Sequence, residues 1–559
     1  MKTVLVGLNA KYYHTNLAIR NIKWYCKPME IEILEMTIND DTDYILYEIL
    51  KKMPDVVGFS CYIWNIEKVL KLCEYIKKVK KEIIIVLGGP EASYDAENLL
   101  KISQIDFIVL GEGEITFKEL LARFCTGGNI DDLDGIAYRT NESIIVKAKA
   151  DYVNLDDIPF PYSDEEISDR LVYYETSRGC PFRCSYCLSS LDNKLRYASI
   201  EKVKVDLNAL SKMGAKIVKL IDRSFDSNIK RAIEILNIIR ELKGDTVFHC
   251  EVNPELINKE FIDSLKGIED RIQFEVGIQT TNKSTLINVS RNPDVESALN
   301  GIKLIVDAGI KVHVDLIAGL PGDSFDSVAD SFNDVYKLNP DEIQLGFLKL
   351  LKGTNLRKYK DKYGIEFRSD APYEVLKTST MSYYELHELK SIAFLVDKYY
   401  NSGRFNKTLN FLLSFYDAPF DLYKSMYDYW ESYNLFNRRH SLNDLYDIMY
   451  KFAVSKRIDS MLIKDYLRYD YMFSTNNKAY PNCLKDVYQK IPDSVKSLLH
   501  DDEWLQHNLP MAKNMSSIEK GKNISIGFFK HDILGENDKG VYIAFLHCKD
   551  KTYCAKIYD

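Results

Sequence analysis

The sequence predicts an α/β fold in three parts: an N-terminal doubly wound, Rossmann-like domain, a central partial (β/α)6 barrel of the TIM type, and a mainly helical C-terminal extension. Through the first two-thirds of the chain, short runs of Val, Ile and Leu alternate with segments of helical apolar spacing. That alternation is typical of buried parallel strands joined by crossover helices. The last third is rich in Tyr, Phe, Asn and Lys. We place the three parts and a linker at residues 1–140, 141–170 (linker), 171–371 and 372–559.

The N-terminal part contains five apolar runs that we predict as strands, with a helix at 66–79. In a doubly wound sheet, ligands bind beyond the carboxyl ends of the strands. Three loops with Gly, Ser or acidic residues occur at such ends, at 60–62, 88–91 and 111–114. The predicted strands are 3–7, 31–34, 56–60, 83–87 and 107–110.

The central part shows six further strand signals with helical segments between them. Six such units suit a partial (β/α) barrel, whose functional residues lie at the carboxyl ends of its strands. The Ile-Pro-Phe-Pro sequence at 158–161 marks the linker before it. Beyond the barrel we expect helices to about residue 500 and a short hairpin at 525–528 and 541–545, without a catalytic motif. The predicted barrel strands are 173–176, 217–221, 247–251, 272–277, 312–317 and 342–348.

Composition restricts the function classes. The 559 residues are 46% hydrophobic and 28% charged, which is ordinary for a globular protein. A net charge of -8 disfavours a broad nucleic-acid-binding surface. No run of about 18 apolar residues occurs, so no membrane span is expected. The short apolar start lacks a cleavage site for secretion, so we expect a cytoplasmic protein.

Three of the eleven cysteines are clustered, in the sequence Cys-Pro-Phe-Arg-Cys-Ser-Tyr-Cys that ends at Cys187. Thiolates bind iron–sulfur clusters, and three of them leave one iron of a four-iron cluster open. An open position is what a catalytic metal site requires. Zinc is the alternative, but it needs a fourth ligand, and no Cys or His occurs in the next sixty residues. We therefore predict a [4Fe–4S] cluster on Cys180, Cys184 and Cys187, and interpret the other eight cysteines as small buried hydrophobic residues.

This cysteine motif resembles that of the radical S-adenosylmethionine (SAM) superfamily, which has an aromatic residue before the third cysteine. Tyr186 occupies that position. The resemblance implies that the open iron chelates the methionine part of SAM, that Tyr186 lies near the adenine, and that reductive cleavage yields a 5′-deoxyadenosyl radical.

Further blocks are similar to the oxygen-independent coproporphyrinogen dehydrogenase branch of that superfamily. They are the sequences at 249–254, 275–279 and 315–321, together with Arg291. The resemblance implies that Glu251, Gln279, Arg291 and Asp315 bind SAM. The alternative is that the acidic residues cap helices and that Arg291 is a surface residue. The usual Gly-Gly-Glu loop after the second strand is absent, and Asp222 and Arg223 stand there as candidates for contacting the methionine end or the substrate.

The N-terminal part resembles the cobalamin-binding domain of a large subgroup of the superfamily, and the tail resembles a DUF4080-type extension. Glycines at strand ends would let the backbone approach the flat corrin ring. The Asp-x-His-x-x-Gly motif that supplies a histidine to cobalt is missing, so cobalamin would bind without a protein histidine, and His14 is interpreted as a hydrogen-bonding residue. The alternative is a degenerate domain kept for structure. The cobalamin-binding candidates are Tyr13, His14, Ser60, Tyr62, Gly88, Gly89, Glu91, Gly111 and Glu112.

The resemblance implies a cobalamin-dependent radical SAM enzyme that methylates an unactivated carbon. The alternatives are another reaction with the same cofactors, such as cyclisation, ring rearrangement or tRNA methylthiolation, and a non-catalytic cobalamin or redox sensor. A separate N-terminal three-cysteine cluster, typical of methylthiotransferases, is not evident, and an intact SAM pocket argues against a sensor. The expected partners are an external one-electron reductant such as flavodoxin or ferredoxin and a substrate that is a small molecule, a peptide or tRNA.

Overall fold

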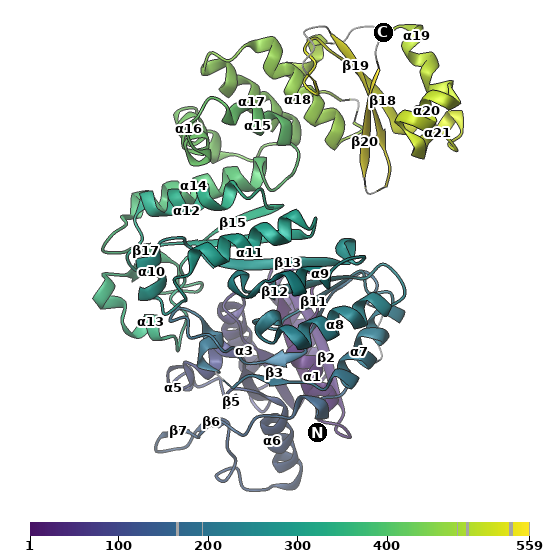
Figure 1. Ribbon diagram of the computed structural model, residues 1–559. Helices are drawn as coiled ribbons and strands as arrows, with labels where there is room; N and C mark the ends of the chain where they lie inside the picture. The colour runs from purple at the N-terminus through teal and green to yellow at the C-terminus, as the bar shows by residue number, and fades with distance from the viewer. Residues whose placement is uncertain are drawn as a thin grey trace. The chain divides into compact units, whose positions relative to one another are not determined.

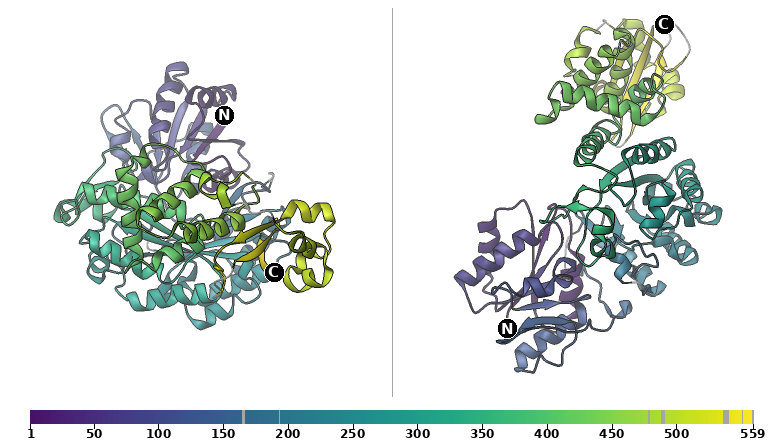
Figure 2. Two further views of the ribbon diagram at one scale, coloured as in Figure 1. Left: turned by 90° about the horizontal axis from the view of Figure 1, so that it is seen from above. Right: turned by 90° about the vertical axis from the view of Figure 1, so that its left-hand side faces the viewer.

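The computed structural model forms two compact units, residues 1–340 with 345–386 and residues 341–344 with 387–559. Figures 1 and 2 show the course of the chain, and each unit is described by itself. The structure describes residues 1–163, 167–192, 194–477, 479–487, 491–535, 540–549 and 551–557.

The first unit begins with a seven-stranded sheet in the order β2-β1-β3-β4-β5-β6-β7. The first five strands are parallel, as predicted, and helices lie on both faces. Neighbouring residues of one strand enter opposite cores, because side chains alternate along a strand: Val4 packs in one apolar cluster and Leu5 in the other. The strands are β1 (Thr3–Asn9), β2 (Ile31–Thr37), β3 (Val56–Ser60), β4 (Ile84–Gly88), β5 (Phe107–Val109), β6 (Ile136–Arg139) and β7 (Ile144–Val146).

The two antiparallel edge strands β6 and β7 differ from the prediction. They extend the sheet past residue 140, so the first residues assigned to the linker belong to the N-terminal sheet. These strands are only three and four residues long, too short to give a clear alternation in the sequence. The helices of this domain are α1 (Leu17–Tyr25), α2 (Thr42–Lys51), α3 (Ile66–Val79), α4 (Pro90–Ser93), α5 (Ala96–Leu99) and α6 (Glu114–Thr126).

The strand order reverses at β1, because β2 and β3 lie on opposite sides of it. Ligands bind at such switch points in open α/β sheets. The loop after β1 ends at Asn16, whose side chain accepts a hydrogen bond from the backbone N–H of Ile19 and caps α1. The same Asn16 donates from Nδ2 to the Ser60 hydroxyl at the end of β3, 2.9 Å away. The two switch-point loops are thereby joined.

The second sheet of this unit is the predicted partial barrel, with six strands in the order β15-β14-β13-β12-β11-β8. Buried and half-buried residues alternate along β12, β13 and β14. The strands are β8 (Leu171–Tyr174), β11 (Ile217–Leu220), β12 (Val247–Val252), β13 (Ile272–Gln279), β14 (Lys311–Ala318) and β15 (Glu342–Phe347).

Helices cover the outside of the barrel, and a short hairpin follows its first strand. The chain then leaves the barrel through a small two-stranded sheet. The helices are α7 (Ile200–Lys212), α8 (Ile229–Glu241), α9 (Lys259–Asp263), α10 (Lys283–Asn288), α11 (Val295–Asp307), α12 (Phe325–Tyr336) and α13 (Asn355–Lys358). The short strands are β9 (Ser177–Arg178), β10 (Arg196–Tyr197), β16 (Glu366–Phe367) and β17 (Val375–Lys377).

The chain beyond the barrel returns to the N-terminal domain. The Tyr373 hydroxyl donates to the buried Glu91 carboxylate, 2.7 Å away. Lys352 forms ion pairs with Asp95 at 2.7 Å and with Glu91 at 3.4 Å. Its ammonium also lies 5.4 Å from the centre of the Tyr373 ring, a cation–π contact. These contacts bind residues 352–373 to the helices α4 and α5.

The second unit is mainly helical, as predicted, and ends in an antiparallel sheet. The predicted hairpin is present as β18 and β19, and a third strand, β20, completes the sheet. No helix in the described part of the chain is long and apolar enough to cross a membrane. The elements are α14 (Tyr383–Tyr399, which spans both units), α15 (Asn406–Leu413), α16 (Pro419–Ser432), α17 (Leu442–Ser455), α18 (Ser460–Ser474), α19 (Asp493–Ser497), α20 (Asp502–Asn508), α21 (Ser517–Asn523), β18 (Ile524–Phe529), β19 (Val541–His547) and β20 (Thr552–Ile557).

A glycine in α11 allows close packing of this helix on the barrel, and it supplies a stability test. A Cβ added at Gly301 would lie 1.9 Å from the Pro254 carbonyl oxygen, so the helix must shift. We predict that Gly301→Ala destabilises the first unit by about 1–3 kcal/mol, the usual cost of overpacking. Thermal unfolding followed by circular dichroism measures this. In the control, Gly521→Ala, the added methyl group meets open space inside α21 and should not destabilise. Equal midpoints for parent and Gly301→Ala would contradict the prediction.

Candidate functional site

A cavity of about 620 Å³ lies in the first unit, between the N-terminal sheet and the barrel. Its N-terminal wall consists of the loop after β1 and the three predicted ligand loops, which follow β3, β4 and β5. Its other wall comes from the first three barrel strands and the loops that follow them. The barrel residues used below are Tyr173, Glu175, Arg178, Lys219, Arg223 and Glu251.

Seven of the nine predicted cobalamin-binding residues line this cavity. They are His14, Ser60, Tyr62, Gly88, Gly89, Gly111 and Glu112.

The other two predicted cobalamin-binding residues, Tyr13 and Glu91, are not among the lining residues. The Tyr13 ring packs edge-on against the ring of His14, with the ring centroids 4.7 Å apart. Glu91 is 2% exposed, and its carboxylate is bound by Tyr373 and Lys352. The prediction that Glu91 binds cobalamin is therefore corrected, because its carboxylate points toward the chain beyond the barrel. The direction of this side chain could not be predicted from the sequence.

His14 forms a hydrogen bond within the protein. Its Nδ1 lies 3.3 Å from the Tyr173 hydroxyl. Burial, together with the positive charges of Lys11, Lys219 and Arg170, lowers the pKa of His14. A neutral imidazole that bonds to a barrel tyrosine agrees with the interpretation of His14 as a hydrogen-bonding residue.

Aromatic rings form a flat wall in the cavity. The rings of Tyr62 and Trp64 are stacked, with centroids 4.5 Å apart and planes within 5°. The Trp64 indole is fixed by donation to the Leu8 carbonyl oxygen at 3.0 Å. Burial raises the pKa of Tyr62 to about 12, so it is neutral.

Gly88, at the end of β4, leaves space in the same cavity. A Cβ at Gly88 would meet only the Val109 Cβ, at 3.9 Å, so this part of the wall is open because a side chain is missing. A flat aromatic wall together with an open glycine wall fits a planar macrocycle such as a corrin.

The cysteine loop is held on several sides. Gly179 precedes it with a φ of +91°, and a Cβ there would lie 2.5 Å from the Lys194 carbonyl oxygen, so only glycine fits. The backbone N–H of Cys180 donates to the Asp192 carbonyl oxygen at 3.1 Å, and that of Ser185 donates to Val289 at 2.9 Å. The Ser185 carbonyl oxygen accepts from the Leu356 N–H at 2.8 Å.

The thiols of this loop influence one another through their charges. Burial raises the pKa of the Cys180 and Cys184 thiols, and each of the two is raised further by charge on Cys187. Three thiols on one pinned loop suit a cluster with one open iron. Among the described residues, no three His, Cys, Asp or Glu side chains are grouped around a position for a single metal ion.

The remaining cysteines are partly as predicted. Cys26, Cys61, Cys73 and Cys250 are buried, which confirms the interpretation for these four. Cys483, Cys548 and Cys554 are half-buried. Cys125 is exposed near the end of α6, so the prediction of burial is wrong there.

Arg291 joins the cysteine loop to the barrel. Its Nη2 donates to the Gly277 carbonyl oxygen at 2.6 Å, and its Nη1 lies 3.4 Å from the Tyr186 hydroxyl and 3.9 Å from the Cys184 Sγ. The alternative of a surface charge is therefore wrong. The contact between Arg291 and Cys184 was not predictable from the sequence, because the two residues are 107 positions apart.

Of the other predicted SAM-binding residues, Glu251 and Gln279 lie at the carboxyl ends of β12 and β13, and Asp315 lies within β14. Glu251 lines the cavity; burial raises its pKa, and Arg223 approaches it at 3.8 Å. Gln279 ends β13 with a φ of +71°, and its buried Oε1 accepts no hydrogen bond within the described part of the chain. Such an acceptor suits a ligand donor. Asp315 pairs with His313, 3.2 Å from its Nε2.

Asp222 has a different role from the one predicted. It is 1% exposed, and its carboxylate accepts hydrogen bonds from the Thr176 N–H at 2.9 Å, the Thr176 hydroxyl at 2.6 Å and the Ser177 hydroxyl at 2.5 Å. Its oxygens are thus occupied by the connection between β8 and the cysteine loop. The structure assigns Asp222 to positioning that loop, in place of contact with SAM. Arg223, next to it, does line the cavity.

A charged group inside the barrel was not predicted. Lys219 lies 2.7 Å from the Glu275 carboxylate, and His249 Nε2 lies 3.0 Å from the same carboxylate. Although burial acts to raise it, these two partners hold the pKa of Glu275 well below its usual range. The half-buried positions of β11 to β13 therefore give the barrel a polar interior beside the cavity. In the sequence, this polar interior is indicated only by charged residues at alternate positions of β11 to β13, which are otherwise apolar.

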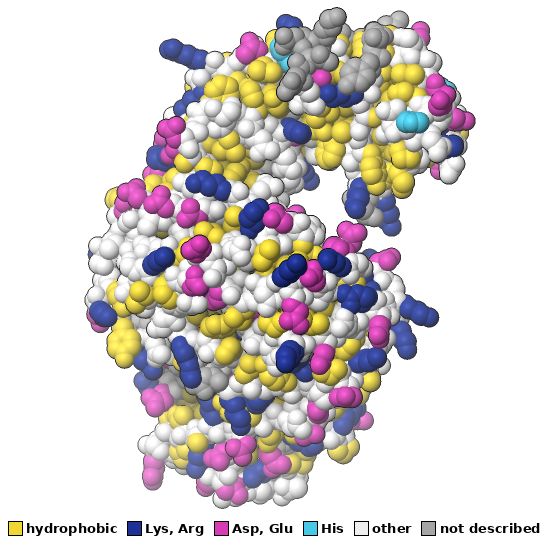
Figure 3. All heavy atoms as spheres, viewed as in Figure 1, with side chains coloured by type: hydrophobic (Ala, Val, Ile, Leu, Met, Phe, Trp, Pro, Cys, Tyr) yellow, Lys and Arg dark blue, Asp and Glu magenta, His cyan; other side chains and the backbone are white. Residues whose placement is uncertain are grey.

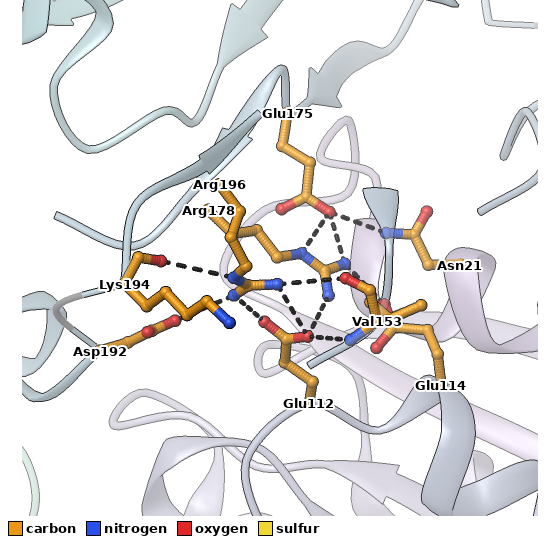
Figure 4. A network of polar contacts seen from close by, with 9 residues as sticks. All are labelled: Asn21, Glu112, Glu114, Val153, Glu175, Arg178, Asp192, Lys194 and Arg196. Atoms are coloured by element: carbon orange, nitrogen blue, oxygen red, sulfur yellow. Dashed lines mark hydrogen bonds and ion pairs between the residues drawn. The ribbon is translucent and has the colours of Figure 1, made fainter. Parts of the chain in front are cut away.

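Sequence analysis did not predict the buried ion network around Arg178, although one of its members, Glu112, is a cobalamin-binding candidate (Figure 4). The Arg178 guanidinium lies 2.6 Å from Glu114 and 2.6 Å from Glu175. It also lies 3.4 Å from Glu112, which pairs with Arg196 as well. Glu112 and Glu114 belong to the N-terminal domain, whereas the arginines flank the cysteine loop. The network therefore joins the predicted cobalamin loop to the predicted cluster loop.

Comparison with protein families identifies the three parts. Residues 3–121 match the B12 binding domain, residues 174–335 match the radical SAM superfamily, and residues 361–545 match a protein family of unknown function, DUF4080. Residues 174–335 therefore form a radical SAM domain, and residues 3–121 form a B12-binding domain. The predicted cofactor set of a [4Fe–4S] cluster, SAM and cobalamin is confirmed by these two domains.

Named relatives are distant and cover part of the chain. An uncharacterised methyltransferase from Pyrococcus horikoshii is 26% identical over 59% of this chain and 74% of the relative. The cobalamin-dependent radical SAM methyltransferase TokK from Streptomyces tokunonensis is 25% identical over 56% of this chain, which spans 50% of TokK. The cobalamin-dependent SAM radical enzyme OxsB shares the fold, with a TM-score of 0.61, 14% identity, and coverage of 92% of this chain and 82% of OxsB.

The Arg178 network predicts a pH-dependent stability change. Burial alone would raise the pKa of Glu114, but the charge of Arg178 and its hydrogen bond lower it overall. This pair therefore contributes stability above the ordinary Glu pKa and loses it as the pH falls through the lowered folded value. In Arg178→Gln, Glu114 is buried without a partner, so we predict a loss of about 3–5 kcal/mol near neutral pH. The loss should shrink toward about pH 5, because a protonated Glu114 no longer needs the partner.

Thermal unfolding at several pH values measures this effect. The double variant Arg178→Gln/Glu114→Gln is the control, since it removes both charges and should recover part of the lost stability. A stability loss that is the same at about pH 5 and about pH 8 would show that Glu114 is not the group left uncompensated.

Proposed function

We propose that this enzyme is a cobalamin-dependent radical SAM methyltransferase that methylates an unactivated carbon. The observation that carries the proposal is the single cavity onto which both the B12-binding loops and the barrel residue Glu251 open. When bound, the cluster with SAM supplies a hydrogen-abstracting radical, and cobalamin supplies a methyl group. A substrate in this cavity would have access to both.

The chain's own residues hold the reactants in place. Cys180, Cys184 and Cys187 are the cluster ligands, and Arg291 fixes their loop against β13. Glu251 and Gln279 are placed to orient SAM, since one lines the cavity and the other has a free buried acceptor. Orientation of this kind accounts for a large part of enzymatic rate enhancement.

The cavity also presents apolar surface to the reactants. Its N-terminal wall includes the Tyr62–Trp64 stack and apolar side chains of the sheet core, such as Phe59 and Phe117. His14 supplies no cobalt ligand in this proposal, because the chain lacks the Asp-x-His-x-x-Gly motif that provides one.

An external one-electron carrier, a flavodoxin or ferredoxin, completes the proposed reaction as reductant. The substrate stays open among a small molecule, a peptide and tRNA. Methylation is preferred to cyclisation because TokK and the relative from Pyrococcus horikoshii are named methyltransferases, whereas cyclases are named among other relatives of similar identity. A product heavier by one methylene group would distinguish methylation from a cyclisation or ring rearrangement.

The cluster assignment is tested by removing its ligands. We predict that the triple variant Cys180→Ala/Cys184→Ala/Cys187→Ala loses the iron–sulfur absorbance and forms no 5′-deoxyadenosine from SAM under dithionite. Anaerobic reconstitution followed by iron analysis and product chromatography measures both. In the control, Cys250→Ala, a buried barrel cysteine is changed and a normal iron content is expected. A full cluster in the triple variant would show that other residues hold it.

The cobalamin assignment is tested by filling the space beside Gly88. We predict that Gly88→Leu folds but binds cobalamin at least about tenfold more weakly, because the new side chain occupies the open wall. Gly88→Ala is the matched control, since its methyl group meets only the Val109 Cβ at 3.9 Å. Titration of the apoprotein with cobalamin, followed by absorbance, gives both affinities. Parent-like binding by Gly88→Leu would place the corrin elsewhere.

A further inference from the structure

We propose that an exposed basic segment, residues 358–362 (Lys-Tyr-Lys-Asp-Lys), docks the acidic one-electron carrier protein that reduces the cluster. The inference rests on the proposed function, because the cluster must gain an electron from outside the chain before SAM is cleaved. Nothing in the cavity itself provides a surface for a second protein. The electron donor must therefore approach the cysteine loop from another side.

The segment lies directly beside the cysteine loop. α13 (Asn355–Lys358) contacts that loop through the Leu356 N–H, which donates to the Ser185 carbonyl oxygen at 2.8 Å. Ser185 stands between the cluster cysteines Cys184 and Cys187. Lys358 follows Leu356 by two residues, so a protein bound to this segment is close to the cluster.

The support under the segment is well fixed. Leu356 is 2% exposed, and Arg357 donates to the Leu350 carbonyl oxygen at 2.6 Å. The Arg357 guanidinium also lies 4.7 Å from the centre of the Tyr373 ring, the same tyrosine that bonds to Glu91. At the far end, the Tyr363 carbonyl oxygen accepts from the Ser379 N–H at 2.9 Å. The exposed lysines therefore project from a rigid base, which suits specific docking.

The charge of this surface is opposite to that of the chain as a whole. Residues 355–363 contain four basic side chains and one acidic side chain, whereas the chain has a net charge of -8. Lys358 and Lys362 are exposed, and Lys360 is paired with Asp361 at 2.6 Å. Arg183, exposed on the cysteine loop two residues before Ser185, adds a further positive charge.

An acidic carrier would be repelled by the net negative charge of this protein and attracted to the basic segment, which orients the encounter. Tyr359, 62% exposed, adds a hydrophobic contact of the kind found at the centre of protein interfaces. Figure 3 shows basic and hydrophobic side chains among those exposed at the edge of the molecule where Figure 1 places α13.

The step at this surface is a one-electron transfer. The reduced carrier is oxidised by one electron and the cluster is reduced by one. No bond forms or breaks between the two proteins, and no proton moves between them. The surface has only to hold the carrier near the loop and release it afterwards, for which a small, charged and salt-sensitive interface is suitable.

The test compares two reductants on the reconstituted holoenzyme. In Lys358→Glu/Lys362→Glu, we expect flavodoxin to bind about tenfold or more weakly at low salt and to reduce the cluster correspondingly more slowly. Dithionite, which needs no docking surface, should reduce parent and variant at equal rates. Titration with flavodoxin and the loss of cluster absorbance measure binding and reduction.

Two further variants isolate the effect of charge at this position. Lys358→Arg/Lys362→Arg keeps the charge and should behave like the parent. Lys212→Glu changes an exposed lysine at the end of α7, at the opposite end of the barrel, and should leave flavodoxin binding unchanged.

The outcomes separate this inference from the proposed function. Parent-like flavodoxin binding and reduction by Lys358→Glu/Lys362→Glu would overturn the docking surface, while dithionite-driven SAM cleavage would still support the enzyme. Failure of the parent to cleave SAM with dithionite would overturn the proposed function and the docking inference with it. A selective loss with flavodoxin, reproduced in the parent by raising the salt concentration, supports the inference.

Discussion

The Arg178 guanidinium lies between carboxylates of two domains, and the geometry of the site depends on it. Glu114 and Glu112 approach it from the N-terminal domain and Glu175 from the barrel, all largely removed from solvent. Removing the Arg178 guanidinium would leave several buried carboxylates without this partner, which costs several kcal/mol. Arg178 precedes Cys180 by two residues, so the same ion pairs that close the interface also position the cluster loop.

Other contacts also hold the N-terminal domain against the barrel, around the first loop of the N-terminal domain. The backbone N–H of Leu171, at the start of the barrel, donates to the Tyr13 carbonyl oxygen at 2.8 Å, and the Thr15 N–H donates to Leu171 at 3.3 Å. The first loop of the N-terminal domain thus pairs with the first barrel strand. Arg170 adds an ion pair to Glu35 at 2.7 Å. The cavity is therefore bounded by fixed contacts on both sides, which favours reactants held at a constant separation.

Much of the architecture could be predicted from the sequence, for a physical reason. Strands buried on both faces, such as β1 and β3, are continuous apolar runs, and the helix at 66–79 has strong helical spacing, so both are evident in the sequence. The short edge strands β6 and β7 pair through backbone atoms over three or four residues and leave no comparable pattern. The cysteine motif was recognisable because its ligands are local in sequence.

The direction of a side chain at a loop could not be predicted. Glu91 and Asp222 follow strands at positions typical of ligand-binding residues, yet both are turned inward onto hydroxyl and N–H donors. Arg291 and Cys184 meet across 107 residues of sequence, and Arg178 meets Glu114 across 64. Such contacts depend on how distant parts of the chain pack together, and a local sequence pattern does not reveal this packing.

The hydrogen bond from Leu356 to Ser185 has a consequence for where the catalytic part of the chain ends. The radical SAM match stops at residue 335, but Leu356 and Tyr373 lie beyond it and are bonded to the cysteine loop and to Glu91. A fragment cut at that match would lose a support of the cluster loop and leave a buried carboxylate without its hydroxyl donor. The structural limit of the first unit is residue 386, so the self-contained piece is longer than its family boundary suggests.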